Sequence, residues 1–404
     1  MRFPTGLTAL THRDFRLFWS GQCVSLVGRW MQAVGLAWLV LELTDSPLRL
    51  GIANALQFAP ILLLAFVAGA LADRVPKRRL LLWTQGALMA AALALAALTA
   101  TGHIRYWQIL VLASIMGIAN ALDMPTRQSF VIELVGREDL INAVALNSAV
   151  FNAARIVGPA LGGILIARYG VAIAFLVNGV TYAPVLGALV AMEAGRTSHG
   201  LRTGLRAEIT DGLRYAAQVP LVSLILSLVL AVSIFVMNHN VLVPLLARDV
   251  LQEDVNGFGL LMAAVGAGAI LAAAILAQFG RGRLPLPGLV AAAVVASLGI
   301  LALTPVREFW LAAGLLFVAG FAQIVFLSSS NTTLQITTPD ELRGRVMSLY
   351  TLAFAGMSPV GSFLIGGVAE AFGTPAACAV GGGLGLACVL GLTAVWARRR
   401  AFAW

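Results

Sequence analysis

Hydrophobic residues occur along this chain in long, continuous stretches that are separated by short polar or charged segments. A helix needs about 20 apolar residues to cross the hydrocarbon core of a bilayer, and most of the stretches reach that length. They do not alternate between apolar and polar positions, as the strands of a membrane barrel do. Because lipid offers the backbone no hydrogen-bonding partner, we expect these stretches to be membrane-spanning helices.

The pattern predicts twelve spanning helices and therefore an all-α membrane protein. We expect no cleavable secretory peptide before the first helix. The expected spans are residues 17–41, 48–70, 80–101, 106–127, 140–167, 171–192, 221–246, 257–278, 288–304, 309–332, 346–372 and 376–396.

Composition supports a lipid environment and excludes several other classes of protein. Hydrophobic residues make up 60% of the chain and charged residues only 11%, whereas a soluble domain carries about a quarter charged residues. The three cysteines lie in apolar spans and indicate no disulfide framework. The four histidines show no metal-ligand spacing, and no catalytic triad or phosphate-binding loop is present. We therefore expect no enzyme activity, no cofactor and no metal.

Positive charge predicts the orientation. With the N-terminus in the cytoplasm, twenty of the 27 Lys and Arg residues fall on the cytoplasmic side and five on the other. The positive-inside rule therefore places both termini in the cytoplasm. The net charge of +9 reflects this topology rather than binding to nucleic acid. Arginine replaces lysine almost everywhere, as in GC-rich prokaryotes, so we expect the bacterial cytoplasmic membrane.

The expected spans fall into two related halves. A polar linker, residues 193–220, separates six spans from six, and Leu205, Ile209 and Leu213 give it the spacing of an amphipathic surface helix. The predicted domains are therefore residues 1–192, the linker 193–220 and residues 221–404. Residues 137–140 (REDL) match 339–342 (PDEL), and residues 158–162 (GPALG) match 358–362 (SPVGS). Such repeats predict two pseudo-symmetric six-helix bundles that give alternating access to a central cavity.

Several motifs resemble one transporter family. Residues 69–79 (GALADRVPKRR) are similar to the signature between spans two and three of the major facilitator superfamily, with proline where the family has glycine. Residues 28–32 (GRWMQ), 120–128 (NALDMPTRQ) and the 138–163 region resemble its enterobactin-exporter and drug-efflux branch. The resemblance covers essentially the whole chain. It implies a secondary transporter that works as a monomer.

The resemblance also implies a cytoplasmic gating motif, in which Asp73 latches against the start of span eleven. Residues 338–341 there resemble a capping box, and a helix N-terminus would attract a carboxylate. The alternative is that the basic cluster only sets the topology. The residues of the implied gating motif are Gly69, Asp73, Arg74, Lys77, Arg78, Arg127 and Glu341.

Span five carries a second motif, residues 154–163 (ARIVGPALGG), which resembles that of proton-coupled exporters in the superfamily. This likeness implies export. Proline removes a backbone donor and glycine permits close helix approach, so plain helix packing is the alternative. The residues of the antiporter motif are Gly158, Pro159, Gly162 and Gly163.

Polar residues within the apolar spans are candidates for a substrate cavity, because such groups avoid lipid. They recur at helical spacing on single faces. The candidates are Gln22, Ser25, Arg29, Gln32, Asn54, Gln57, Asn152, Arg155, Asn238 and Gln323.

The charged candidates carry the most specific hypotheses. A cation at the membrane centre costs at least ~2.5–3.5 kcal/mol, so Arg29 and Arg155 are expected to contact an anionic or hydrogen-bonding substrate. Alternatively, Arg155 pairs with Asp123 or with helix carbonyls. Asp123 and His239 are the candidates for proton coupling. Asp123 could equally pair with Arg127 one turn away, and His239 could be structural.

The predicted function is proton-coupled export of small amphipathic organic molecules, such as a drug, a macrolide or a siderophore-like compound. The expected partners are the bilayer, a small-molecule substrate and protons. An uptake symporter or lipid translocator of the same fold is one alternative. A non-transporting membrane sensor is another.

Overall fold

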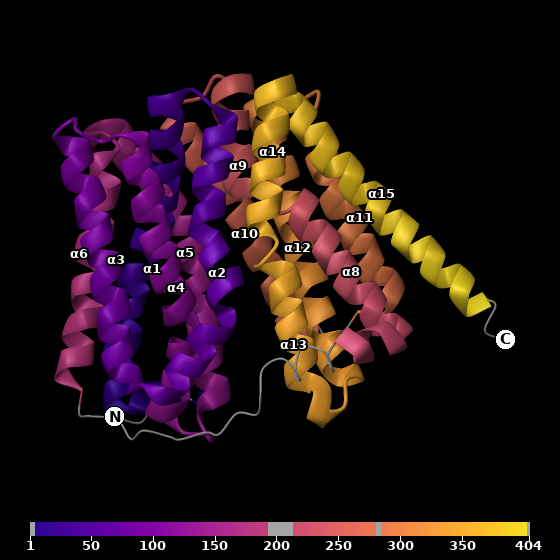
Figure 1. Ribbon diagram of the computed structural model, residues 1–404, viewed down its shortest axis with the longest axis horizontal. Coiled ribbons are helices and arrows are strands. Elements are labelled where there is room, and N and C mark those ends of the chain that lie inside the picture. The colour runs from indigo at the N-terminus through magenta and orange to yellow at the C-terminus, as the bar shows by residue number, and fades with distance from the viewer. Residues whose placement is uncertain (1–4, 193–212, 280–283, 402–404) are drawn as a thin grey trace. The chain divides into compact units, whose positions relative to one another are not determined.

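The computed structural model describes residues 5–192, 213–279 and 284–401, apart from the side chains of residues 5–6, 65–70, 72–74, 341 and 399–401. The described chain is helical and contains no strand. Its first half contains η1 (Thr5–Thr11), α1 (Arg13–Thr44), α2 (Pro47–Arg74), α3 (Lys77–Ala100), α4 (Tyr106–Val135), α5 (Leu140–Tyr169) and α6 (Ala172–Ala191) (Figure 1). Its second half contains α8 (Pro220–Phe235), α9 (His239–Leu245), η2 (Leu246–Val250), α10 (Val255–Phe279), α11 (Leu286–Ala302), α12 (Phe309–Thr337), α13 (Asp340–Phe354), α14 (Ser358–Phe372) and α15 (Thr374–Ala401).

Eleven segments of the described chain are long and apolar enough to cross a membrane. The shorter apolar helix Leu286–Ala302 occupies the position of the ninth expected span. Large apolar side chains on these helices are also exposed: Val111, Ile115 and Ile118 form a stripe along α4 and are 48%, 41% and 44% exposed. Exposed apolar surface of this kind suits contact with lipid.

Two of the expected spans are interrupted. In span seven, α8 ends at Phe235 and α9 begins at His239. The side chain of Asn238 donates to the carbonyl of Ile234 at 2.6 Å, and that carbonyl would accept the backbone bond of a continuous helix. In span eleven, α13 ends at Phe354, five residues before Pro359, which has no N–H to donate to Ala355.

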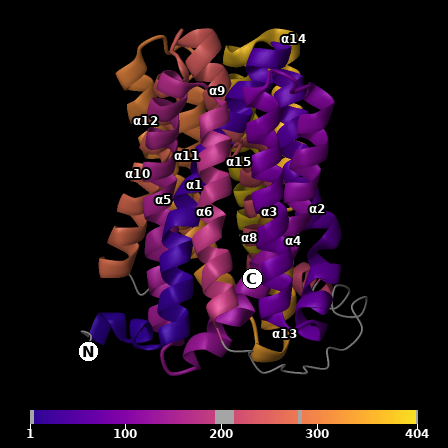
Figure 2. The ribbon, with the colours of Figure 1, turned by 90° about the vertical axis from the view of Figure 1, so that its left-hand side faces the viewer.

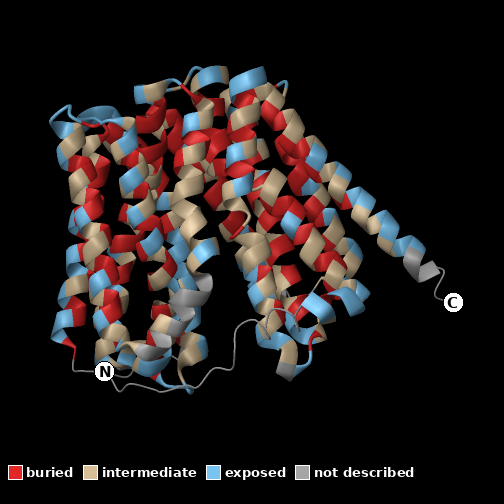
Figure 3. Cartoon of the chain, in the orientation of Figure 1, coloured by how far each residue is buried: buried red, intermediate tan, exposed pale blue. Residues whose placement is uncertain are grey.

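The described residues form two compact units. Unit 1 comprises those within residues 1–45, 59–201 and 254–259, and unit 2 comprises those within 46–58, 202–253 and 260–404. Compared with the expected halves, the start of α2 belongs to unit 2 and the start of α10 belongs to unit 1. Buried residues recur along the helices of both units (Figure 3).

In unit 1, α6 packs against both α1 and α3, and α1 also packs against α5 (Figure 2). Glycines at seven-residue spacing on α1 permit this approach. A Cβ at Gly21 would lie 3.0 Å from the backbone of Val185, and one at Gly35 would lie 3.1 Å from Ala174. In unit 2, α11 packs against α12 and α15, and α15 also packs against α8 and α14.

Candidate functional site

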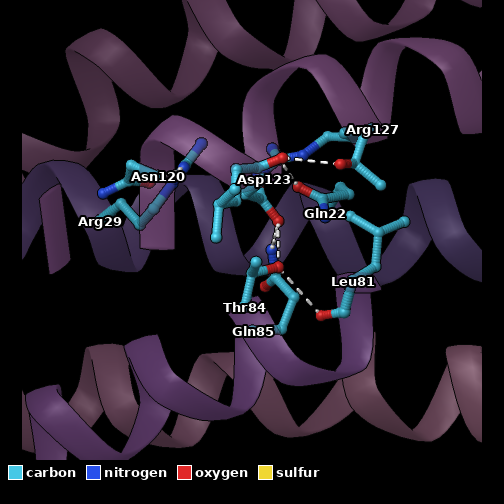
Figure 4. A network of polar contacts seen from close by, with 10 residues as sticks. Gln22, Arg29, Leu81, Thr84, Gln85, Asn120, Asp123 and Arg127 are labelled. Atoms are coloured by element: carbon cyan, nitrogen blue, oxygen red, sulfur yellow. Dashed lines mark hydrogen bonds and ion pairs between the residues drawn. The ribbon is translucent and has the colours of Figure 1, made fainter. Parts of the chain in front are cut away.

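A buried polar network in unit 1 surrounds Asp123 of α4 (Figure 4). The carboxyl side chain is 1% exposed and forms an ion pair with Arg127, one helical turn away. Its other oxygen accepts hydrogen bonds from Gln85 Nε2 at 2.6 Å and from Thr84 Oγ1 at 3.0 Å, both on α3. A buried charge needs such partners, because it has left water.

The same network reaches α1. The Nη1 atom of Arg127 donates to Gln22 Oε1 at 2.9 Å. Arg29 donates to Asn120 Oδ1 at 3.4 Å, which is a weak hydrogen bond (Figure 4). Arg29 and Asn120 are half-buried, whereas Gln22 and Ser25 are buried. The polar face predicted on α1 is therefore directed to the protein interior, with Arg29 as its most accessible member.

A further group of hydrogen bonds joins α1 to α6 and α4. Gln32 accepts a hydrogen bond from Asn178 Nδ2 at 2.6 Å and donates to Met116 Sδ at 3.4 Å. Thr181 donates to the carbonyl of Asn178. The sequence-based set omitted Thr84, Gln85, Asn178 and Thr181. The sequence could have indicated them. Thr84 and Gln85 are adjacent polar residues within one apolar span, and Asn178 and Thr181 lie three residues apart on one face of another.

Arg155 of α5 lies apart from Asp123. Its guanidinium carbon is 5.9 Å from the centroid of the Trp30 ring, a cation–π distance. Trp30 also meets Phe151 edge to face, with centroids 5.9 Å apart. The third polar residue of this region, Asn152, donates to the carbonyl of Ser148 at 2.8 Å.

Unit 2 has its own buried polar cluster beside the interruption in span seven. His239 Nε2 lies 2.9 Å from Gln323 Oε1 of α12, and these side chains are 6% and 1% exposed. Asn238 is 4% exposed, and α14 approaches it so closely that a Cβ at Gly361 would lie 2.6 Å from its Oδ1 atom. The two interrupted spans therefore meet at this cluster.

The remaining cavity candidates lie in the part of α2 that belongs to unit 2. Asn54 Nδ2 donates to Ser362 Oγ of α14 at 2.6 Å. Gln57 is half-buried on the same helix.

The implied gating motif is only partly visible. Lys77 forms an ion pair with Glu133 of α4, and Arg78 donates to the carbonyl of Val190 at 2.9 Å, near the end of α6. Arg127 belongs to the Asp123 network. The side chains of Asp73, Arg74 and Glu341, and residue Gly69, lie outside the described set.

The antiporter motif lies at close helix contacts within unit 1. A Cβ at Gly158 would clash with Trp30 and lie 2.9 Å from the carbonyl oxygen of Val27 on α1. At Gly163 it would lie 2.9 Å from the carbonyl oxygen of Val255, at the start of α10. The motif therefore lets the α5 backbone approach two helices, whatever further role it has.

Unit 2 repeats these contacts. A Cβ at Gly366 of α14 would lie 2.7 Å from the carbonyl oxygen of Pro47, at the start of α2. Gly259 and Gly51, one turn into α10 and α2, abut Pro159 and Ser362 respectively. The close approaches at Gly163 and Gly366 are thus equivalent, as expected for an internal repeat.

Among the described residues, no three His, Cys, Asp or Glu side chains are grouped so that they could hold a metal ion. The described chemistry of both clusters consists of hydrogen bonds, one buried ion pair and aromatic contacts. Such groups can bind a polar or charged organic molecule and can exchange a proton.

Comparison with known sequences identifies relatives over most of the chain. A family model described as transmembrane secretion effector matches residues 4–400. The staphyloferrin A transporter of Staphylococcus aureus (strain NCTC 8325 / PS 47) is 26% identical over 382 residues, which cover 89% of this chain and 90% of the relative. The multidrug efflux pump Tap of Mycolicibacterium fortuitum is 28% identical, with coverages of 86% and 87%. The enterobactin exporter EntS of Shigella flexneri is 26% identical, with coverages of 93% and 90%.

Solved structures share the fold. The nucleoside transporter NupG superposes with a TM-score of 0.72 at 11% identity and covers 94% of this chain and 98% of its own. A bacterial homologue of the human lysosomal transporter Spinster, in an inward-facing and occupied conformation, gives 0.69 at 16% identity, with coverages of 98% and 96%. These likenesses confirm the predicted fold class, an all-α membrane protein with the major facilitator fold.

Proposed function

The chain belongs to the transmembrane secretion effector family of the major facilitator superfamily, and on this premise we propose that it exports small amphipathic organic molecules in exchange for protons. It is a multi-pass membrane transporter, and its relatives are transporters rather than enzymes. This confirms the superfamily and the absence of enzyme chemistry that the sequence predicted. Substrate class, coupling ion and monomeric state belong to the proposal.

The observation that carries the proposal is the buried carboxylate of Asp123. It lies within a spanning helix, is 1% exposed, and is held by Arg127, Thr84 and Gln85. Ionisable groups inside a membrane protein are costly and mark proton or substrate pathways. We propose that Asp123 binds the coupling proton, and that the neutral acid releases its ion pair with Arg127.

Alternating access then links the proton to the substrate. Proton binding frees Arg127 and, through Gln22, loosens the hydrogen bonds between α4 and α1. Exchange requires in addition that substrate binding and protonation of Asp123 exclude each other. His239 with Gln323 is the second candidate for a proton site, because imidazole titrates near neutral pH.

Export is the proposed direction for two reasons. Two of the relatives are named as an efflux pump and an exporter. In addition, span five carries residues that resemble the motif of proton-coupled exporters, at its contacts with α1 and α10. The staphyloferrin A transporter is named without a direction, so uptake is the rival. Steady-state accumulation of the substrate in cells, rather than depletion, would favour uptake.

The proposal is tested in inside-out vesicles that contain the protein and are acidified inside. Siderophores, macrolides and other amphipathic drugs are added one at a time while the pH gradient is followed. We expect one compound to dissipate the gradient with wild-type protein and not with Asp123→Asn. Glu42→Gln is the matched control, because Glu42 is an exposed carboxylate near the end of α1 that bonds only Trp38 in the described structure.

A compound that is transported at full rate after the gradient has been collapsed would exclude proton coupling. If wild type and Asp123→Asn dissipate the pH gradient equally, Asp123 is not the proton site, although proton exchange itself is not refuted. His239→Gln is then the next variant to test. No flux of any compound, with a stable partner protein recovered in its place, would favour a sensor.

A further inference from the structure

The interior of unit 1 carries more positive charge than its described side chains neutralise. Away from the helix ends, its described spanning segments contain the cations Arg29, Arg127 and Arg155 and the single carboxylate of Asp123. Asp123 is committed to Arg127 by an ion pair and to α3 by two hydrogen bonds. Two cations therefore remain without a described counter-charge.

Neither of these two arginines has a described contact with a carboxylate. The described hydrogen bond of Arg29 is to the amide oxygen of Asn120, at 3.4 Å, and a charged neighbour of Arg29 is another cation, Arg127. Arg155 lies over the ring of Trp30, at 5.9 Å, and within the described structure no carboxylate is within ion-pair distance of either guanidinium. Both side chains are half-buried, so each keeps some accessible surface. A cation in a membrane interior is seldom left uncompensated, which points to a charge supplied by the ligand.

The surroundings of Arg155 specify more than charge. Trp30 and Phe151 meet edge to face beside it. Beside Trp30 the backbones of α1 and α5 approach closely, since a Cβ at Gly158 would lie 2.9 Å from the carbonyl oxygen of Val27. An aromatic surface next to a planar guanidinium fits a flat, unsaturated group that bears an anionic oxygen.

We propose that the substrate is an organic anion with an aromatic or similarly planar group, held by Arg155 and Trp30, with Arg29 as the second cationic contact. This inference rests on the proposed transport function and names the substrate class of its site. A cationic drug finds no free carboxylate among the described interior groups of unit 1. The cluster in unit 2, Asn238, His239 and Gln323, offers no carboxylate either.

Equilibrium binding to the purified protein in detergent tests the inference without requiring transport. Two fluorescent probes share a xanthene core: fluorescein is an anion at neutral pH, whereas rhodamine 123, whose carboxyl group is a methyl ester, is a cation. We expect fluorescein to bind more tightly and Arg155→Gln to weaken it by at least about tenfold, since a charged hydrogen bond is lost. Arg155→Lys should retain part of the affinity, and the binding of rhodamine 123 should not weaken in either variant.

The matched control is Arg168→Gln, which removes an exposed arginine from the last turn of α5. Should Arg155→Gln fail to fold, Arg29→Gln takes its place. A second measurement then uses wild-type protein, where benzoate should displace fluorescein and the neutral benzamide should not. The inference is overturned if rhodamine 123 binds as tightly as fluorescein, if neither arginine variant changes the affinity for fluorescein, or if Arg168→Gln weakens it equally. Anion-selective binding without proton-coupled flux would instead refute the proposed function alone.

Discussion

The ion pair between Asp123 and Arg127 should reveal itself in a double-mutant cycle. Arg127→Gln leaves a buried carboxylate without its counter-charge, and breaking a buried pair in this way costs about 3–5 kcal/mol. Asp123→Asn/Arg127→Gln removes both charges and should unfold at a higher temperature than Arg127→Gln alone. The measurement is thermal unfolding of the purified protein in one detergent, with Arg168→Gln as the exposed control.

Losses that simply add in the double variant would contradict the pair. They would mean that each side chain acts through separate contacts. A loss in Arg168→Gln as large as that in Arg127→Gln would point to a general effect of charge removal.

At this scale the sequence predicted partners only where spacing along one helix determined them. Asp123 and Arg127 are one helical turn apart, so the sequence offered Arg127 as a partner for Asp123, with Arg155 as the alternative partner. The hydrogen bonds from Thr84 and Gln85 depend on which face of α3 meets α4, and that is a property of packing between helices. The position of Arg155 over Trp30, away from Asp123, depends on packing in the same way.

Close contact between α1 and α5 makes Gly158 sensitive to the smallest addition. In Gly158→Ala the new methyl group would clash with Trp30 and lie 2.9 Å from the carbonyl oxygen of Val27. Overpacking of this kind costs about 1–3 kcal/mol, so both the unfolding temperature and transport should fall. Gly187→Ala in α6 is the control, because no atom lies within 4 Å of its added methyl group. Equal stability of the two variants would show that Trp30 and Val27 can shift to accept the added methyl group at little cost.

The start of α5 is fastened to the N-terminal segment by a contact that depends on pH. Hydrogen bonds from Thr8 and from His12, whose Nε2 atom lies 2.8 Å from Asp139 Oδ2, lower the pKa of the Asp139 carboxyl. A carboxyl with a lowered pKa in the folded state stabilises at pH values above its unfolded pKa of about 3.9. That contribution is lost as the pH falls through the folded pKa.

Asp139→Asn should therefore lower the unfolding temperature at pH 7 and have progressively less effect below about pH 4. Thermal unfolding of wild type and variant across this range measures the difference. A difference that grows in acid would contradict the assignment.

Helix boundaries were predictable from hydrophobicity, but the register of the repeat was not. The sequence aligned Pro159 with Pro359, whereas the contacts match Gly158 with Gly361 and Gly163 with Gly366. The glycines that end α5 and α14, Gly170 and Gly373, have φ values of 80° and 84° and follow the contact register. Many small residues in both segments permit several alignments of the two halves. The alignment that the contacts support differs by three residues, nearly one helical turn, from the alignment of the two prolines.

For the whole molecule, we propose that both termini lie in the cytoplasm, because the cationic loops alternate with nearly uncharged ones. On a background without the three native cysteines, His103→Cys, between α3 and α4, should react with a membrane-impermeant maleimide in intact cells. Arg137→Cys, between α4 and α5, should react only after the cells are permeabilised. Both positions are exposed, so the reverse pattern would invert the topology.

The fold could be predicted almost entirely from sequence, since lipid permits few solutions for a chain of this hydrophobicity. The division into domains remains a prediction, because the compact units exchange the first turns of α2 and α10. Of the candidate site, the residues could be proposed from polar stripes, but their grouping into a network around Asp123 and a cluster around His239 could not.

The most direct test of proton exchange through Asp123 uses purified protein in acid-loaded liposomes, where no other transporter contributes. A compound found active in vesicles is added, and its uptake and the internal pH are recorded together. The account predicts that liposomes with wild-type protein accumulate the compound as the pH gradient falls, and that nigericin abolishes this accumulation. Liposomes with Asp123→Asn should neither accumulate the compound nor lose the gradient when it is added. Accumulation at an unchanged rate after nigericin, or by Asp123→Asn, would contradict it.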